Sequence, residues 1–280
     1  MGLNNMKKNI SFYKISAAGN DFVMIDNRKK LLPKNTGQIA QKLCHRQFSI
    51  GADGLILLEP SKSADFRMRY FNADGSAAAM CGNGGRSVAR FAHLLGAASK
   101  KMVFETEAGL VKAEILGRIV RLALYEPKDV RLDFPLKVEK KEFDASFINT
   151  GVPHTIIYVN DIEKLDVAGL GRMIRYHRQF APAGTNVNFV QKKDEHTIVV
   201  RTYERGVEDE TLACGTGVTA SAIVSGLKGL VTAPVKCVTR GGDTLTVAFT
   251  INDAGDFLSP VSNVYLEGPA EVSFTGEVEI

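Results

Sequence analysis

The chain has 280 residues, of which 45% are hydrophobic and 24% are charged, and its formal net charge at pH 7 is +4. This length favours two domains, and the balance of apolar and charged residues is typical of a protein with a hydrophobic core. The small net charge argues against a nucleic-acid-binding protein and against one that binds a membrane surface.

The N-terminal segment and the cysteines are typical of a cytoplasmic protein. Lys7 and Lys8 are not followed by the apolar stretch of a secretory signal, and no apolar run approaches the roughly 20 residues that span a bilayer. The four cysteines are therefore expected to be reduced. They form no CxxC pair and no Cys/His cluster with zinc spacing, so no metal site is predicted.

Short runs of β-branched and aromatic residues recur along the chain and predict strands. In chain order they span residues 10–15, 21–26, 54–58, 66–71, 101–106, 118–125, 155–159, 186–190, 197–203, 244–249, 264–267 and 271–280. Turn residues separate these runs, which favours largely antiparallel sheets.

Two segments predict helices with different surroundings. Residues 86–95 read RSVARFAHLL and are followed by Gly96, a common residue just beyond a helix C-terminus. Residues 218–227 read VTASAIVSGL and are almost without charge, which is typical of a helix buried on all sides. Each segment comes shortly after a Cys-Gly pair, at Cys81 and at Cys214, so each cysteine is expected at the start of a helix.

Three landmarks recur at an offset of 132 or 133 residues. The matching phrases are RYFN at 69–72 and RTYE at 201–204, CGNG at 81–84 and CGTG at 214–217, and TEAG at 106–109 and TRGG at 239–242. A period this long indicates two copies of one domain rather than a solenoid. We place the first half at residues 1–126 and the second at 127–269, and we expect the last strand, about 270–280, to return to the first half.

A cysteine at the start of a helix is well placed for acid–base chemistry. The unpaired N–H groups and partial positive charge of the helix terminus lower the pKa of such a thiol and bind carboxylates. If Cys81 and Cys214 face opposite sides of one ligand, one thiolate can remove a proton from a carbon while the other thiol protonates the opposite face. These two steps invert a stereocentre. A thiol-redox or ligand-binding protein is the alternative from another class.

The sequence resembles the diaminopimelate epimerases over nearly its whole length. The phrases that carry the resemblance are AAGNDFVMID, GADGLILL, FNADGSAAAMCGNGGRSVARF, NTGVPH, TNVNFV, YERGVEDETLACGTG and VYLEGPAEVSFTGEVEI. The resemblance implies an α+β fold of two pseudo-symmetric domains, each a mostly antiparallel sheet rolled around a central helix. It also implies a PLP-independent isomerase without cofactors, which converts LL-diaminopimelate to meso-diaminopimelate in lysine and peptidoglycan precursor synthesis.

The resemblance implies roles for residues at matching positions. Cys81 and Cys214 correspond to the catalytic pair, and His154 and Glu204 correspond to residues that tune the acidity of the thiols. The positions that correspond to substrate-binding residues are Asn20, Asn72, Gly82, Asn83, Asn186, Glu204, Arg205, Gly215 and Thr216. Arg205 suits a carboxylate through its fork of donors, and asparagine offers both donors and acceptors.

Two positions depart from the pattern of the family. Val152 stands where many members carry an asparagine that contacts substrate, and Gly54 stands where some members carry glutamine. Because neither residue can make the corresponding side-chain hydrogen bond, a racemase of another amino acid is kept as an alternative. The partner implied is a small-molecule amino acid, with a homodimer left open and with no nucleic acid or membrane expected.

Overall fold

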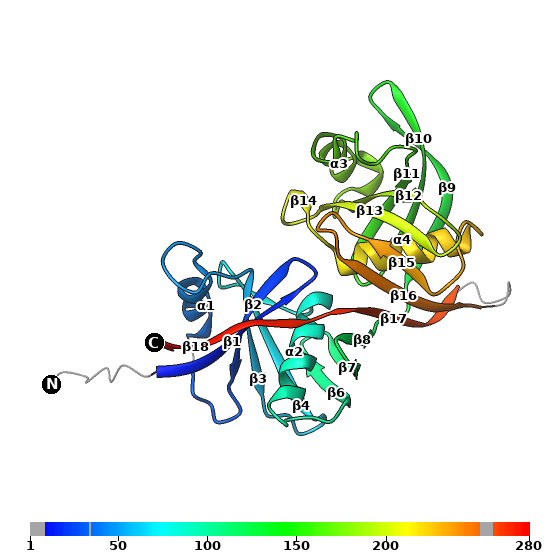
Figure 1. Cartoon of the computed structure of the whole chain (residues 1–280). Coiled ribbons are helices and arrows are strands. Elements are labelled where there is room, and N and C mark those ends of the chain that lie inside the picture. Colours follow the sequence, from blue (N-terminus) through cyan, green and yellow to red (C-terminus); the bar gives the residue numbers. More distant parts are fainter. Residues whose placement is uncertain (1–8, 34, 253–259) are drawn as a thin grey trace. The chain divides into compact units, whose positions relative to one another are not determined.

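The computed structural model describes residues 9–33, 35–252 and 260–280, so Lys7 and Lys8 lie outside the described residues. The chain forms two compact units (Figure 1). Unit 1 comprises Met1–Leu122 and Pro269–Ile280, and unit 2 comprises Ala123–Gly268. Within the described ranges, no helix is both long enough and apolar enough to cross a membrane.

Unit 1 is a mostly antiparallel sheet packed against a long helix, α2 (Gly82–Leu94), with a shorter helix, α1 (Thr36–Cys44), before β3. Its strands are β1 (Asn9–Ala17), β2 (Asn20–Asp26), β3 (Gly54–Glu59), β4 (Phe66–Asn72), β5 (Ala77–Ala78), β6 (Lys101–Thr106), β7 (Gly109–Leu116), β8 (Ile119–Ala123) and β18 (Glu271–Glu279). The pairing order is β18–β1–β2–β3–β4–β6–β7–β8, with β2–β3 and β4–β6 parallel. Helix α2 contacts strands from β1 to β7, so the sheet curves around it.

Unit 2 is built in the same way around α4 (Gly215–Leu227), with α3 (Val167–Arg175) and a short 3-10 helix, η1 (Arg178–Phe180), before β12. Its strands are β9 (Lys128–Val138), β10 (Lys141–Asn149), β11 (Pro153–Tyr158), β12 (Asn186–Lys192), β13 (Thr197–Glu204), β14 (Asp209–Thr211), β15 (Val235–Val238), β16 (Thr244–Ile251) and β17 (Val261–Pro269). The pairing order is β9–β10–β11–β12–β13–β15–β16–β17, with β11–β12 and β13–β15 parallel.

The two units therefore share one topology, strand for strand. In each unit the central helix follows a short strand, β5 or β14. In the order of the chain it comes between two strands that pair in parallel, β4 and β6 in unit 1 and β13 and β15 in unit 2. Strand β18 pairs with β1 in the position that β9 takes beside β10. The predicted α+β fold class is confirmed, because each sheet is mostly antiparallel and encloses one helix.

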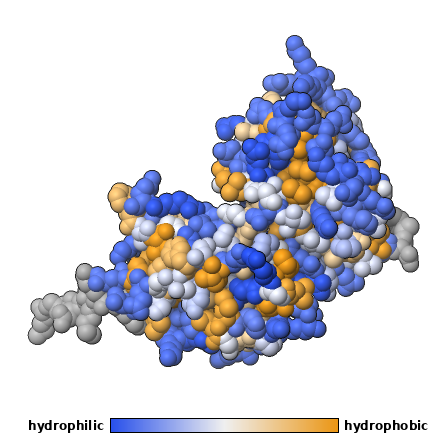
Figure 2. All heavy atoms as spheres, viewed as in Figure 1, coloured by the Kyte–Doolittle hydropathy of each residue, from blue (hydrophilic) through white to orange (hydrophobic). Residues whose placement is uncertain are grey.

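Helix α4 is buried along almost its whole length, as its apolar sequence predicts. Its hydroxyl groups stay satisfied inside the unit because they donate to carbonyl groups one turn back: Ser221 Oγ to Gly217 O at 2.8 Å and Ser225 Oγ to Ser221 O at 2.7 Å. In Figure 2, hydrophilic residues cover most of the visible surface, and hydrophobic residues form patches between them. This distribution is the usual result of burying the apolar faces of helices and strands.

The sequence did not predict β9, whose residues are largely exposed and lack the alternation of a half-buried strand. The apolar segments at 86–95 and 218–227 form the later turns of α2 and α4, which begin at the glycines directly after Cys81 and Cys214, as the Cys-Gly pairs predict. Glycine has a low helix propensity. Packing of the first turn against the strands compensates for that propensity, and such packing is invisible in a local pattern.

Candidate active site

Cys81 caps the N-terminus of α2. Its backbone is extended, with φ −141° and ψ 128°, and its Sγ accepts a hydrogen bond from the backbone N–H of Gly84 at 3.5 Å. The sulfur thus occupies the place that a serine or aspartate oxygen usually takes at a helix start. N–H groups and the positive end of the helix dipole converge there, as at a helix start that binds an anion. The Cys81 side chain is half-buried.

The amide side chains predicted to bind substrate in unit 1 are partly brought together. Asn83 Nδ2 donates to Asn20 Oδ1 at 2.5 Å, and Asn20 Nδ2 donates to Asp53 Oδ2 at 2.9 Å. Arg86 was not predicted as a site residue, although it ends the phrase MCGNGGR. Its side chain is 0% exposed, and its Nη2 donates to Asn83 Oδ1 at 2.7 Å. A buried guanidinium therefore orients the asparagine in the first turn of α2.

Asn72 lies at the end of β4, opposite Gly54 in the β3–β4 pair. Its Nδ2 donates to Ser76 Oγ at 3.0 Å, so it belongs to the turn before β5 rather than to the Asn20–Asn83 pair. A Cβ atom at Gly54 would lie 2.5 Å from Cε2 of Tyr70. It would also lie 2.6 Å from the backbone oxygen of Phe71, so no larger side chain fits there, which explains why this chain carries glycine where some members of the family carry glutamine.

Cys214 stands at the N-cap position of α4, with an extended backbone of φ −121° and ψ 109°, but unlike that of Cys81 its side chain makes no capping hydrogen bond with the backbone N–H groups of the described helix. Its Sγ shares a hydrogen bond of 3.4 Å with Thr216 Oγ1, and the residue is only 7% exposed. Burial raises the pKa of the Glu204 carboxyl, and a hydrogen bond with the Cys214 side chain opposes part of that rise. The structure thus brings together three predicted residues, Cys214, Thr216 and Glu204.

His154 and Asn186 are neighbours across the parallel β11–β12 pair. Asn186 Nδ2 donates to Pro153 O at 2.9 Å, and its Oδ1 accepts from the backbone N–H of Arg205 at 2.8 Å. The side chain of Arg205 donates from Nη1 to Ala183 O at 3.2 Å. Asn186 therefore joins the start of β11 to the loop after β13, and it positions Arg205 beside it.

Burial lowers the pKa of His154 to about 3, and the positive charge of Arg205 acts in the same direction. The imidazole is neutral at pH 7. Its Nδ1 lies 3.0 Å from Asn188 Nδ2, and Asn188 also accepts a hydrogen bond from Thr202. Neither Asn188 nor Thr202 was predicted, although they lie in the phrases TNVNFV and RTYE, because a polar residue that alternates with apolar ones in a strand usually faces solvent. Val152 lies in the turn before His154, where its carbonyl accepts from Thr150 N.

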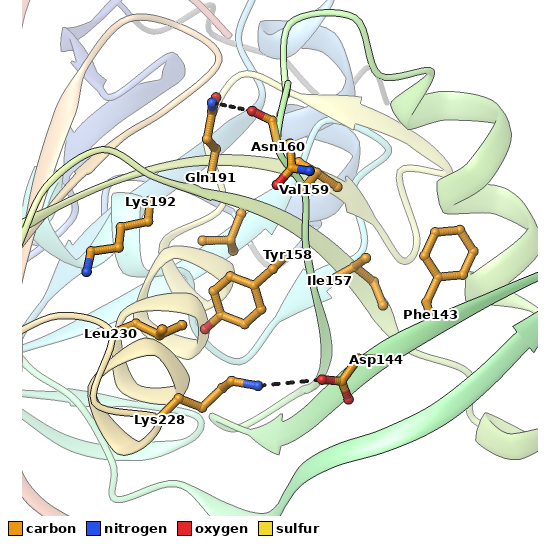
Figure 3. Close-up of a pocket in the computed structure, with 11 residues that line it drawn as sticks. Phe143, Asp144, Ile157, Tyr158, Val159, Asn160, Gln191, Lys192, Lys228 and Leu230 are labelled. Carbon is orange, nitrogen blue, oxygen red and sulfur yellow. Dashed lines mark hydrogen bonds and ion pairs between the residues drawn. The ribbon is translucent and has the colours of Figure 1, made fainter.

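A cavity of about 460 Å³ in unit 2 is distinct from these residues (Figure 3). It lies at the C-terminal end of α4, where Lys228 points toward Asp144 beside the Tyr158 ring. Helix α4 has 13 residues and so places this end about 20 Å from Cys214. None of the predicted site residues lines the cavity.

Comparisons with known proteins found relatives that match nearly the whole chain. The family model described as diaminopimelate epimerase matches residues 12–120 and 146–270. The diaminopimelate epimerase of Aquifex aeolicus is 47% identical over 281 residues, which cover 96% of this chain and 98% of the relative. That of Chlorobaculum tepidum is 44% identical, over 95% and 100% of the two chains. A Bacillus anthracis phenazine biosynthesis protein of the PhzF family shares the fold, with a TM-score of 0.77 at 17% identity over 98% of this chain and 100% of that one.

Proposed function

The chain belongs to the diaminopimelate epimerase family, and on this premise we propose that Cys81 and Cys214 interconvert LL- and meso-diaminopimelate by proton transfer at one α-carbon. It is an isomerase of amino-acid stereochemistry, which acts on a small molecule in lysine biosynthesis. The observation that supports the mechanism is that two units of the same topology each begin their central helix at a cysteine.

The reaction needs one thiolate and one thiol. The thiolate removes the α-proton and becomes a thiol, and the other thiol protonates the opposite face of the carbon and becomes a thiolate. In the reverse reaction the two cysteines exchange roles, which is why both are the same residue type. The proposal requires that both sulfurs reach one carbon from opposite faces.

Negative charge develops on the substrate carboxylate when the proton leaves. Backbone N–H groups at Gly82 and Asn83, and at Gly215 and Thr216, are suited to stabilise it, since the first N–H groups of a helix have no intrahelical partners. Glu204, hydrogen-bonded to Cys214, would influence the protonation of that thiol.

The second amino-acid end of the substrate needs its own contacts. We assign these to Asn20, Asn72, Asn186 and Arg205. The Arg205 guanidinium can hold a carboxylate with two parallel hydrogen bonds. The asparagines can accept from the ammonium and donate to the carboxylate.

Val152 favours a second candidate, a racemase of another amino acid, because valine cannot make the side-chain hydrogen bond of an asparagine. A panel of amino acids compared with diaminopimelate under the same conditions separates the two. Turnover of another amino acid that equals or exceeds that of diaminopimelate would favour the second candidate.

Exchange in heavy water tests the two-cysteine mechanism. LL-diaminopimelate incubated with the enzyme should acquire deuterium at the α-carbon. Cys81→Ser and Cys214→Ser should each lower epimerisation by roughly 100-fold or more, because each removes a general acid–base group. Retention of full activity in either variant would refute the proposal.

We also propose that the enzyme is cytoplasmic, because its two thiols must remain reduced. The resemblance to the family also leads us to propose a homodimer that binds no nucleic acid. Sedimentation should then give about twice the 30.4 kDa mass of one chain, and a mass of one chain would exclude the dimer.

A further inference from the structure

Asn188 lies directly beneath the first turn of α4. It is the third residue of β12 and is 0% exposed. A Cβ atom built on Gly217 would lie 2.3 Å from Asn188 Oδ1 and 3.1 Å from Thr202 Oγ1. The amide group therefore sits against the backbone of the helix three residues after Cys214, where a polar side chain can influence the site.

The hydrogen bonds of Asn188 fix the orientation of its amide. Nδ2 lies 3.2 Å from Thr155 O, and Oδ1 lies 3.0 Å from Thr202 Oγ1. A backbone carbonyl oxygen can only accept, so the atom facing Thr155 must be the amide nitrogen. The opposite orientation would place two acceptors against each other.

The orientation of Asn188 determines the tautomer of His154. The same Nδ2 lies 3.0 Å from His154 Nδ1 and must donate to it, so Nδ1 carries the lone pair. Since the buried imidazole is neutral, its one proton is on Nε2. This nitrogen is buried and has no hydrogen-bond partner within the part of the chain that the structure describes. A buried donor without a partner is unfavourable and calls for a specific reason.

Unit 1 shows that the fold does not require this polar cluster. At the offset of 132 residues, Phe22 takes the place of His154, and Ile56 takes the place of Asn188. Both are 0% exposed, and Ile56 approaches Gly84 as Asn188 approaches Gly217. The same topology is thus built with Phe22, Ile56 and Tyr70 in unit 1 and with the hydrogen-bonded triad of His154, Asn188 and Thr202 in unit 2. The triad is therefore more than a packing element.

We propose that Asn188, held by Thr202, is a positioning residue that fixes His154 as the Nε2–H tautomer, so that His154 offers a neutral N–H donor to the anionic substrate. Since no residue within the described ranges accepts from Nε2–H, we take its acceptor to be a carboxylate oxygen of the substrate. The tautomer stands on the hydrogen bonds alone. Its catalytic use rests on the proposed function.

Nitrogen NMR of the full-length enzyme, labelled with ¹⁵N-histidine, tests the tautomer without substrate. The His154 signals are assigned by their loss in His154→Gln. In the unsubstituted enzyme Nε2 should show the shift of a protonated nitrogen and Nδ1 that of an unprotonated one. A proton on Nδ1 would overturn the proposal.

Asn188→Leu tests the role of the amide, because leucine has about the same volume but offers no N–H group to Nδ1. The proton should then no longer be confined to Nε2, so that Nδ1 shows the signal of a protonated nitrogen, and kcat/KM should fall roughly 10- to 100-fold as the donor to substrate is lost. Ile56→Val, at the equivalent buried position of unit 1, is the matched packing control and should change kcat/KM less than twofold. A moved proton with unchanged kcat/KM would refute the catalytic use. Full activity in Cys214→Ser would instead refute the proposed function and leave the tautomer assignment intact.

Discussion

Gly217 and Gly84 are equivalent glycines in the first turns of α4 and α2, but their surroundings differ. A Cβ atom at Gly217 would meet Asn188 Oδ1 at 2.3 Å, far inside normal contact. The Asn188 amide cannot turn away, because hydrogen bonds hold both of its ends. A Cβ atom at Gly84 would meet the terminal methyl groups of Ile56 at 3.0 Å and Met68 at 3.3 Å, which can shift.

These contacts predict different free energies of unfolding for the two alanine variants. Alanine gains about 1 kcal/mol over glycine inside a helix. Overpacking costs about 1–3 kcal/mol, and a disrupted buried hydrogen bond costs about 1 kcal/mol more. Gly217→Ala should therefore be destabilised by about 1–3 kcal/mol, whereas Gly84→Ala should stay within about 1 kcal/mol of the unsubstituted enzyme. At about 2–4 °C per kcal/mol, calorimetry resolves this difference.

Calorimetry of both variants at one protein concentration measures the difference in melting temperature. The heavy-water exchange assay measures the activity of the site. Gly217→Ala should melt at a lower temperature than Gly84→Ala and should also lose exchange activity, because the start of α4 or the Asn188 amide must move. If Gly217→Ala melted at or above the temperature of Gly84→Ala, the close approach of Asn188 to the helix would be wrong.

Three further predictions concern single side chains. At pH 8 iodoacetamide should label Cys81 before Cys44 and Cys237, since burial raises the pKa of Cys44 to about 12 and that of Cys237 further; peptide mass spectrometry that found a buried thiol labelled first would contradict this. The pKa of Glu204 is raised above 4.5 by burial, so its contribution to stability is complete below pH 4.5 and is lost as the pH rises through the raised value. The free energy of unfolding, measured with denaturant, should therefore fall less between pH 4.5 and pH 8 in Glu204→Gln than in the unsubstituted enzyme. An equal fall in both proteins would exclude the effect. Arg86→Lys should lower the free energy of unfolding by about 1–3 kcal/mol, because lysine cannot replace the planar fork of donors; an unchanged denaturation midpoint would show that the guanidinium is not needed.

The sequence by itself determined the features that depend on local pattern. The offset of 132 or 133 residues predicts two equivalent halves, and the pairs Cys81-Gly82 and Cys214-Gly215 predict a thiol at each helix start. The almost uncharged stretch at 218–227 predicts a buried helix, and α4 confirms it. Such features are readable because helix termini and apolar periodicity involve residues close together in the chain.

Only the tertiary structure decided which polar side chains meet inside each unit. The sequence does not show that Asn188 is buried against Gly217 in unit 2, where its equivalent in unit 1, Ile56, packs in an apolar core. Nor does it show that Arg86 is fully buried on Asn83. The triad of His154, Asn188 and Thr202 comes from three strands, and its hydrogen bonds depend on the register of β11, β12 and β13. Register is a product of the whole sheet, so no local pattern contains it.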